Sequence, residues 1–237
     1  AFFCIDDLQD CAICTATLIY KLRNTKMKKI FALLSTLFFL TTFSAKAEIQ
    51  FGFGLMGGQL SSSGTETEGT AADTSDRSKS FDELFFGADL FLEAIADNGM
   101  AFGVSYVPVD FELGSGERTD ANGSDPAEND DGTRKASADV SDLITLYANV
   151  PVGSNGWYAL GGFHMATITT SETLNESSYG NEDITGYQIG FGQRIDNFKY
   201  EFSYSDFEDI SLTASGGGTN SISANADALT FRISFGF

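Results

Sequence analysis

Six charged side chains stand in segments where apolar residues otherwise alternate with small ones, and their types allow ion pairing. If the turn at residues 196–197 pairs Ile195 with Phe198, Arg194 lies directly opposite Lys199. Two facing cations need a nearby acid, and Glu201, diagonal to Arg194, is the expected one. Across the interior we expect further members of the same network. The full predicted set is Asp89, Glu93, Arg194, Lys199, Glu201 and Arg232.

His164 is the only histidine of the chain, so it is the candidate general base. An acyl-transfer mechanism needs a base beside a serine and oriented by an acid. The local run, Phe163 to Thr167, contains no serine, and its nearest hydroxyl is that of Thr167. We therefore predict that the protein is not an enzyme.

Two stretches resemble ligand motifs without meeting their requirements. Gly52 to Gly57 matches G-x-G-x-x-G, but a dinucleotide site needs a strand before the motif and a helix after it. Residues 125–132 are acidic but lack the spacing of a calcium loop, which leaves weak cation binding as an alternative to solvated acids. We expect no cofactor and no metal centre.

Eight segments show the period of two that places alternate side chains on opposite faces of a strand. They cover residues 49–59, 84–94, 101–111, 140–150, 157–168, 184–195, 198–205 and 229–237. Pro108 predicts an irregularity in the third segment. The fifth is apolar on both faces, so its phase is not assigned.

Short and long connections alternate between these segments. The short ones contain Asn98-Gly99, Asn155-Gly156 and Asp196-Asn197, and the two Asn-Gly pairs predict type I′ hairpin turns. The long ones, residues 60–81, 112–138, 169–183 and 206–224, are polar, acidic and predicted to be loops. This pattern predicts an all-β fold, an eight-stranded antiparallel transmembrane β-barrel with an up-and-down meander. The alternative is a soluble sandwich or lipocalin-type barrel with its apolar face inward.

The two faces of the predicted strands suit different surroundings. Large apolar side chains on one face would meet lipid, while many glycines on the other leave room for polar groups but not for an open water pore. Aromatic residues near the strand ends are expected in interfacial girdles. They are Tyr106, Tyr147, Trp157, Tyr158, Tyr187, Tyr200 and Tyr204.

The N-terminal region predicts export. Residues 27–47 have a basic start, a short apolar core and a small-x-small end, which together indicate a signal peptide. Residues 1–26 are interpreted as an upstream extension outside the native protein, and residues 48–237 as the barrel domain. The first 47 residues hold six of the 14 basic and three of the 33 acidic residues, so the rest has 8 against 30, a net charge of −22. Such a charge disfavours nucleic acid as a partner.

The chain ends in LTFRISFGF, and together with the signal peptide and eight alternating segments this resembles the small outer-membrane β-barrel superfamily. That superfamily includes the OmpA transmembrane domain, OmpX and the opacity-type surface antigens. The resemblance implies a C-terminal signal for the barrel-assembly machinery at Phe231, Ile233, Phe235 and Phe237. It also implies a location in the bacterial outer membrane, contact with its lipid and lipopolysaccharide, and a monomer.

These expectations combine into a non-catalytic outer-membrane protein, structural and able to attach to surfaces through acidic extracellular loops. Two alternatives remain open. The charged interior would suit a narrow or gated channel, because ionic networks in similar barrels are discussed as gates. Some similar barrels modify lipid, which leaves a lipid-modifying enzyme as the second alternative.

Overall fold

The computed structural model describes residues 47–70, 73–120, 132–173, 178–215 and 220–237. The predicted extension, residues 1–26, and all of the predicted signal peptide except Ala47 lie outside the described residues. No helix in the described ranges is long and apolar enough to cross a membrane.

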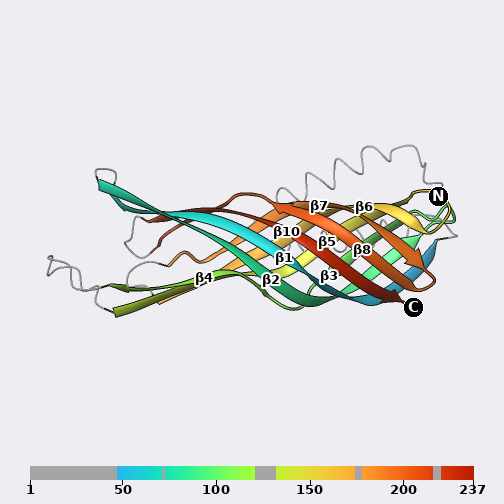
Figure 1. Ribbon diagram of the computed structural model, residues 1–237, viewed down its shortest axis with the longest axis horizontal. Helices are drawn as coiled ribbons and strands as arrows, with labels where there is room; N and C mark the ends of the chain where they lie inside the picture. The colour runs from blue at the N-terminus through green and yellow to red at the C-terminus, as the bar shows by residue number, and fades with distance from the viewer. Residues whose placement is uncertain (1–46, 71–72, 121–131, 174–177, 216–219) are drawn as a thin grey trace, which may run out of the picture. The chain divides into compact units, whose positions relative to one another are not determined.

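Every regular element of the described chain is a β-strand (Figure 1). The strands are β1 (Glu48–Thr70), β2 (Asp73–Ile95), β3 (Ala101–Tyr106), β4 (Phe111–Asp120), β5 (Gly132–Pro151), β6 (Trp157–Glu172), β7 (Asn181–Ile195), β8 (Phe198–Phe207), β9 (Ile210–Thr213) and β10 (Ser221–Gly236).

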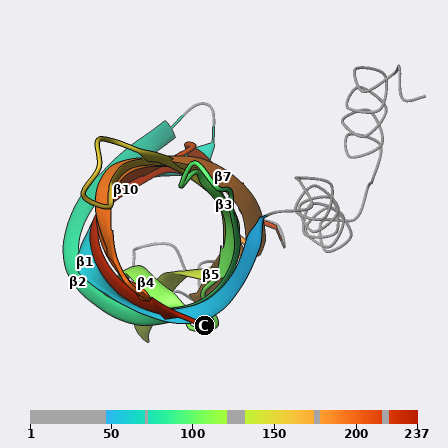
Figure 2. The same cartoon turned by 90° about the vertical axis from the view of Figure 1, so that its right-hand side faces the viewer.

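The strands form one antiparallel sheet that closes on itself (Figure 2). Neighbours follow chain order, and the ring closes where β1 pairs with β10 from Gly52↔Gly236 to Thr67↔Ser221. The ten elements make eight barrel strands, which we call walls to distinguish them from the shorter elements. β3 and β4 are two parts of the third wall, and β8 and β9 are two parts of the seventh. The predicted eight-stranded antiparallel meander is confirmed, and a soluble open sandwich is excluded.

The break in the third wall lies at the predicted irregularity. β3 ends at Tyr106 and β4 begins at Phe111, on either side of Pro108. Opposite the break, the β5 register shifts between Ser141 and Ile144, and Asp142 takes a positive φ of 52°. A proline cannot donate to a sheet ladder, so the wall bends at this point instead of continuing.

The short turns are not the type I′ turns that the Asn-Gly pairs predicted. Gly99 and Gly156 have φ values of 81° and 74°, but the asparagine before each does not have a positive φ. β2 ends at Ile95 and β5 ends at Pro151, before the Asn-Gly pairs are reached, so both connections are longer than two residues. The third turn, Asp196-Asn197, does join the paired residues Ile195 and Phe198 directly.

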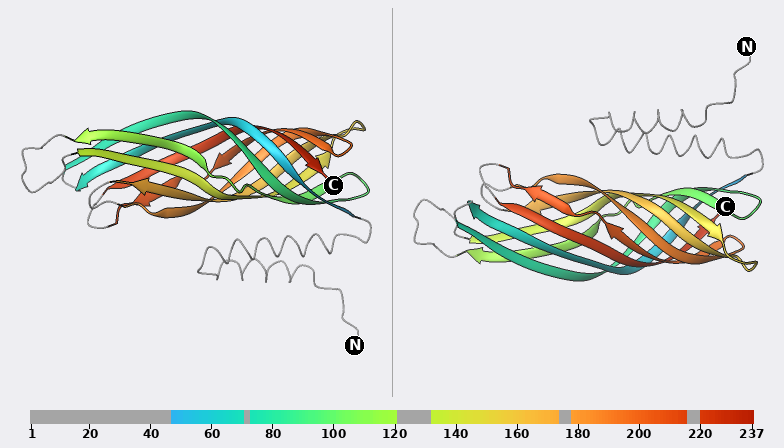
Figure 3. Two further views of the ribbon diagram at one scale, coloured as in Figure 1. Left: turned by 90° about the horizontal axis from the view of Figure 1, so that it is seen from below. Right: turned by 90° about the horizontal axis from the view of Figure 1, so that it is seen from above.

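The long connections are mostly strands, which corrects the prediction of loops. β1 and β2 have 23 residues each and stay paired up to Thr70↔Asp73. At about 3.3 Å per residue, each runs about 75 Å, although about 9 to 11 residues suffice to cross a bilayer. Hairpins therefore extend the barrel far past the length needed to cross a bilayer, at the end opposite the C-terminus (Figures 1 and 3).

Large apolar side chains point outward on the half of the barrel that holds the short turns and the C-terminus. Phe51, Leu90, Ile189 and Phe231 are 48–60% exposed. The same outward face continues around the ring with Ile144, Phe163 and Phe202. Such a belt would aggregate in water but is favourable against lipid.

The opposite half of the barrel has an apolar interior, which differs from the expected polar interior. Its buried members are Leu60, Val107, Phe111, Leu113, Val140, Ala166, Ile168, Tyr179, Ile184, Phe207, Ile210, Leu212, Ala226 and Ala228. The outward neighbours in this half are polar, as Thr167 and Thr169 are beside Ile168 in β6. Along β6 and β10 the in-and-out phase is kept while the polarity of the two faces inverts, whereas β5 changes phase at its register shift, so that Thr145 and Val140 both face inward.

Between β2 and β4 the sheet has a seam without backbone pairing. β2 pairs with β3 only from Leu90↔Tyr106 to Ile95↔Ala101, and β4 pairs with β5 but not with β2. Side chains reach β4 instead: Lys79 Nζ of β2 donates to the carbonyl oxygen of Ser115 at 3.1 Å, and Ser62 Oγ of β1 donates to that of Leu113 at 2.8 Å.

Candidate functional site: an ionic cluster across the barrel interior

Arg232 of β10 lies between two carboxylates from different walls. Its Nε and Nη2 donate to the two oxygens of Asp89 on β2, at 3.0 and 2.7 Å. Its Nη1 forms an ion pair with Glu201 of β8, the residue directly opposite Arg232 in the ladder. The fork of a guanidinium suits this arrangement, because it binds one carboxylate through two bonds and still donates to another.

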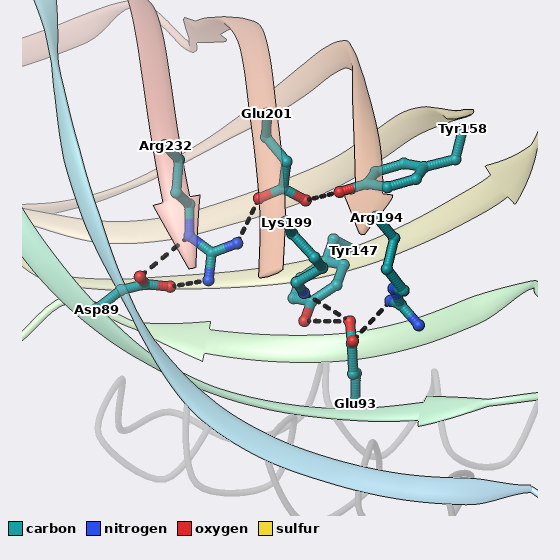
Figure 4. A network of polar contacts seen from close by, with 8 residues as sticks. All are labelled: Asp89, Glu93, Tyr147, Tyr158, Arg194, Lys199, Glu201 and Arg232. Atoms are coloured by element: carbon teal, nitrogen blue, oxygen red, sulfur yellow. Dashed lines mark hydrogen bonds and ion pairs between the residues drawn. The ribbon is translucent and has the colours of Figure 1, made fainter. Parts of the chain in front are cut away.

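Glu93 of β2 is the centre of the second half of the cluster (Figure 4). Its carboxylate accepts from Arg194 Nη2 at 2.7 Å and from Lys199 Nζ at 2.8 Å. Arg194 and Lys199 face each other across β7 and β8, as expected. The acid that bridges them was predicted wrongly, because it is Glu93 from the far wall, whereas Glu201 binds Arg232.

Two tyrosines complete the cluster, and sequence reasoning misplaced both. Tyr147 donates to Glu93 Oε2 at 3.0 Å, and Tyr158 donates to Glu201 Oε1 at 2.9 Å. They were expected in the outward girdles, but both point inward and are buried. The other predicted girdle residues are partly exposed on the outside: Tyr106, Trp157, Tyr187, Tyr200 and Tyr204.

Glycines directly opposite in the neighbouring strands make room for these large groups. Gly103 and Gly192 contact the rings of Tyr147 and Tyr158, where a Cβ atom would overlap the ring. Phe91 also lies in the cluster, with its ring centroid 4.0 Å from Lys199 Nζ and 5.1 Å from Arg232 Cζ. The predicted glycine-lined interior is thus filled by aromatic as well as charged side chains.

The six charges balance, three acids against three cations, and four of them are almost entirely removed from water. The exposed fractions of the Asp89, Glu93, Glu201 and Lys199 side chains are 5% or less. Burial on this scale costs several kcal/mol per ion unless each charge is paired and hydrogen-bonded. The arrangement can therefore hold the walls together and block the interior, while each charge has at least one oppositely charged partner.

His164 contacts two hydroxyl groups that are distant in sequence. Its Nδ1 lies 2.8 Å from Thr145 Oγ1, its Nε2 lies 3.0 Å from Ser205 Oγ, and its ring stacks on Phe207 at 5.3 Å between centroids. Thr167, the nearest hydroxyl in sequence, faces outward instead and donates to Asp183 at 2.8 Å. Histidine and serine thus meet, but the third partner is a threonine and not an acid.

The predicted assembly residues line the outside of the closing strand. Phe231, Ile233 and Phe237 are 40–53% exposed. Phe237 also exchanges backbone hydrogen bonds with Phe51 of β1, at 2.8 and 3.3 Å, and its ring lies 4.6 Å from that of Phe51. The last residue of the chain therefore takes part in closing the barrel.

The acidic hairpins and the stretch from Gly52 to Gly57 are the two places where the sequence resembles a ligand motif. Within the described ranges, no group of three or more His, Cys, Asp or Glu side chains is placed to hold a metal ion. The acidic stretch at residues 125–132 lies outside the described residues except for Gly132. Gly52 to Gly57 lies within β1 and is followed by more strand, so it lacks the helix that a dinucleotide motif requires.

Comparison with known proteins gives similarities of fold. No protein-family model and no curated protein sequence matches the chain. Among solved structures, the chain is similar to Neisserial surface protein A (TM-score 0.36, 10% identity, covering 78% of this chain and 97% of that one). It is similar to Ail, the attachment invasion locus protein of Yersinia pestis (0.36, 13%, 78% and 99%), and to the outer membrane protein AlkL (0.44, 10%, 82% and 93%). The closed barrel described above is the fold that the resemblance to small outer-membrane barrels implies.

Proposed function

We propose that this chain is a non-catalytic bacterial outer-membrane protein whose interior is closed and whose long acidic hairpins stand outside the cell. The carrying observation is the inversion of polarity along single walls. Around the ionic cluster the outside is apolar and the inside charged, whereas beyond it the outside is polar and the inside apolar. A chain in one solvent would not need both arrangements, but a barrel that crosses from lipid into water does.

The orientation follows from the lengths of the connections. The short turns and the C-terminus share one end of the barrel, and the long hairpins share the other (Figure 3). In outer-membrane barrels the short turns are periplasmic and the long connections extracellular. The hairpins then present their carboxylates to the medium, where they are available for contact with surfaces of complementary charge.

Membrane fractionation combined with protease digestion of intact cells tests this proposal. We expect the protein in the outer-membrane fraction, with cleavage confined to the end of the barrel that holds the long hairpins. Recovery in a soluble fraction, or cleavage at the turn of residues 196–197 in intact cells, would contradict it. Permeabilised cells provide the control, because there the periplasmic turns also become accessible.

A gated channel is the second candidate, and one observation favours it. Arg232 holds Asp89 of β2 and Glu201 of β8 at the same time, so it ties two strands together across the interior where a gate would have to open. Single-channel recording in planar bilayers discriminates the two functions. A closed barrel gives no conductance steps, whereas a gated one gives steps that become more frequent in Arg232→Gln.

The exposed aromatic residues of the C-terminal strand suggest how the barrel is assembled. We propose that the C-terminal aromatic positions are recognised by the barrel-assembly machinery and that the barrel is a monomer in outer-membrane lipid and lipopolysaccharide. Replacing Phe237 by Ser should leave unassembled chain in the periplasm.

The lipid-modifying alternative is tested by lipid A mass spectrometry, in which His164→Ala and wild type should give the same spectrum.

A further inference from the structure

The extracellular end of the barrel contains a cavity that the proposed function does not use. It has a volume of about 440 Å³ and lies above the apolar core. Its apolar lining comes from several walls: Phe81, Leu113, Ile168, Ile210, Leu212 and Ile222. Small-molecule sites typically occupy about 300 to 1,000 Å³ and combine apolar walls with a few polar groups.

The charged groups of the rim differ in the partners that the protein itself offers them. Glu66 accepts from the Tyr179 hydroxyl at 2.7 Å, and Glu172 accepts from the Tyr179 backbone N–H at 3.4 Å. Glu117 forms an ion pair with Lys135 at 3.1 Å. The acids of the rim thus have protein donors.

Lys79 has a different environment. Its Nζ donates to the neutral Ser115 carbonyl at 3.1 Å and lies 4.3 Å from the centre of the Phe81 ring. Within the described residues, these partners include no carboxylate. An ammonium over an apolar lining, at the seam between β2 and β4, is complementary to an anionic group attached to a hydrocarbon chain.

We propose that this cavity binds a small single-chain amphiphile with a carboxylate head, the chain lying against Leu113, Ile168 and Leu212 and the head beside Lys79. The ligand enters from the aqueous mouth of the barrel. The site requires neither conductance nor the assembly role of the C-terminus, so it can be tested independently of both.

Photolabelling tests the position of the site. The chain is refolded into lipid nanodiscs and exposed to a diazirine-bearing medium-chain carboxylate, and labelled peptides are mapped by mass spectrometry. We expect labels on the inner residues of β4, β6 and β9 that excess decanoate suppresses. Labels found only on outward belt residues such as Phe163 would overturn the proposal, since they report partitioning into lipid.

Two variants and their controls test the chemistry. Ala224→Phe fills the cavity and should abolish the protected labels, whereas Ala159→Phe, on the outward face of β6, should not change them. In wild type, decanoate should compete better than decanol by about fivefold, because an exposed ion pair contributes up to about 1 kcal/mol and about 1.4 kcal/mol is tenfold. Lys79→Gln should remove this preference and Lys79→Arg should retain it.

Either of two results would refute the assignment of the head group. One is equal competition by decanol and decanoate in wild type, and the other is an unchanged preference in Lys79→Gln. Lys79 is exposed, so its variants should fold, and the heat-dependent gel mobility typical of an intact barrel verifies this. If Ala224→Phe fails that check, the Lys79 pair and the label map still decide the proposal.

Discussion

Replacing Glu93 by Gln tests whether the ionic cluster stabilises the barrel. The carboxylate of Glu93 is fully buried and forms ion pairs with both Lys199 and Arg194. Removing one member of a buried ion pair typically costs about 3 to 5 kcal/mol, because the remaining charge stays buried without compensation.

The structure places the expected cost near the lower end of that range. Arg194 is 21% exposed, so its guanidinium can turn toward water. Lys199 is 2% exposed and cannot, but it keeps its contact with the Phe91 ring at 4.0 Å. A desolvated cation–π contact is worth up to about 2 kcal/mol, so we expect a loss of about 3 kcal/mol in the free energy of unfolding.

Urea titration of the barrel in lipid vesicles measures this value, with Trp157 fluorescence and gel mobility as two independent signals. Glu117→Gln is the matched control, because it breaks an ion pair whose side chains are 56% and 66% exposed. Exposed pairs contribute about 0 to 1 kcal/mol. If both variants lose the same free energy within about 1 kcal/mol, the reasoning about buried charge is wrong.

A double-mutant cycle separates lost pairing from lost packing. Glu93→Gln combined with Lys199→Met removes the buried cation together with its partner while keeping the volume similar. We expect the double variant to be more stable than Glu93→Gln alone, with a coupling energy of about 1 to 3 kcal/mol. A double variant that is additive would show that Lys199 and Glu93 do not stabilise each other.

The other predictions concern packing, pH and the seam. Gly103→Leu should push the Tyr147 ring away from Glu93 and cost about 1 to 3 kcal/mol by urea titration, whereas Gly161→Leu, with open space around it, should not. Partial burial raises the pKa of Asp139, above the apolar belt, from its usual 3.8. The folded state thus disfavours its charge, so Asp139→Asn should raise stability at pH 7 by up to about 0.5 kcal/mol. The gain should shrink as the pH falls through the raised pKa and vanish below 3.8, where the carboxyl is protonated in both states. Hydrogen exchange should be fast at alternate amides of residues 73–89, which face the seam, and slow at the amides of the same segment that pair with β1; uniform protection would show a ladder at the seam.

The sequence was sufficient for the wall but not for the interior. Period-two alternation and the turn residues predicted eight strands, and the outward placement of Phe231 followed from phase alone. Neighbours along a ladder could also be predicted, as Arg194 opposite Lys199 was. The contact of Glu93 with both could not, because it crosses the barrel interior and no ladder neighbour defines it.

Tyr147 and the hairpins were misjudged for separate physical reasons. Tyr147 shares a strand face with Thr145 and Asn149, which point inward, so its phase was available but its aromatic type suggested a girdle. The residues from Leu60 onward are small and polar, which is typical of loops. They form strands because side chains such as Thr65 and Ser78 bond across the hairpin at 2.8 Å, while the ladder satisfies the backbone.

The inversion of polarity explains why β6 had no assignable phase. Its outward face is apolar at Phe163, in the belt, and polar at Thr167, whereas its inward face is polar at His164 and apolar at Ile168. Summed over the strand, both faces are apolar and no single phase is favoured. If the change is located first, Phe163 and His164 fit one arrangement and Thr167 and Ile168 the other, and the switch falls between His164 and Ala166. The same change separates Ser205 from Phe207 in β8, so on these two strands the position at which the alternation changes sign marks where the outside solvent changes from lipid to water.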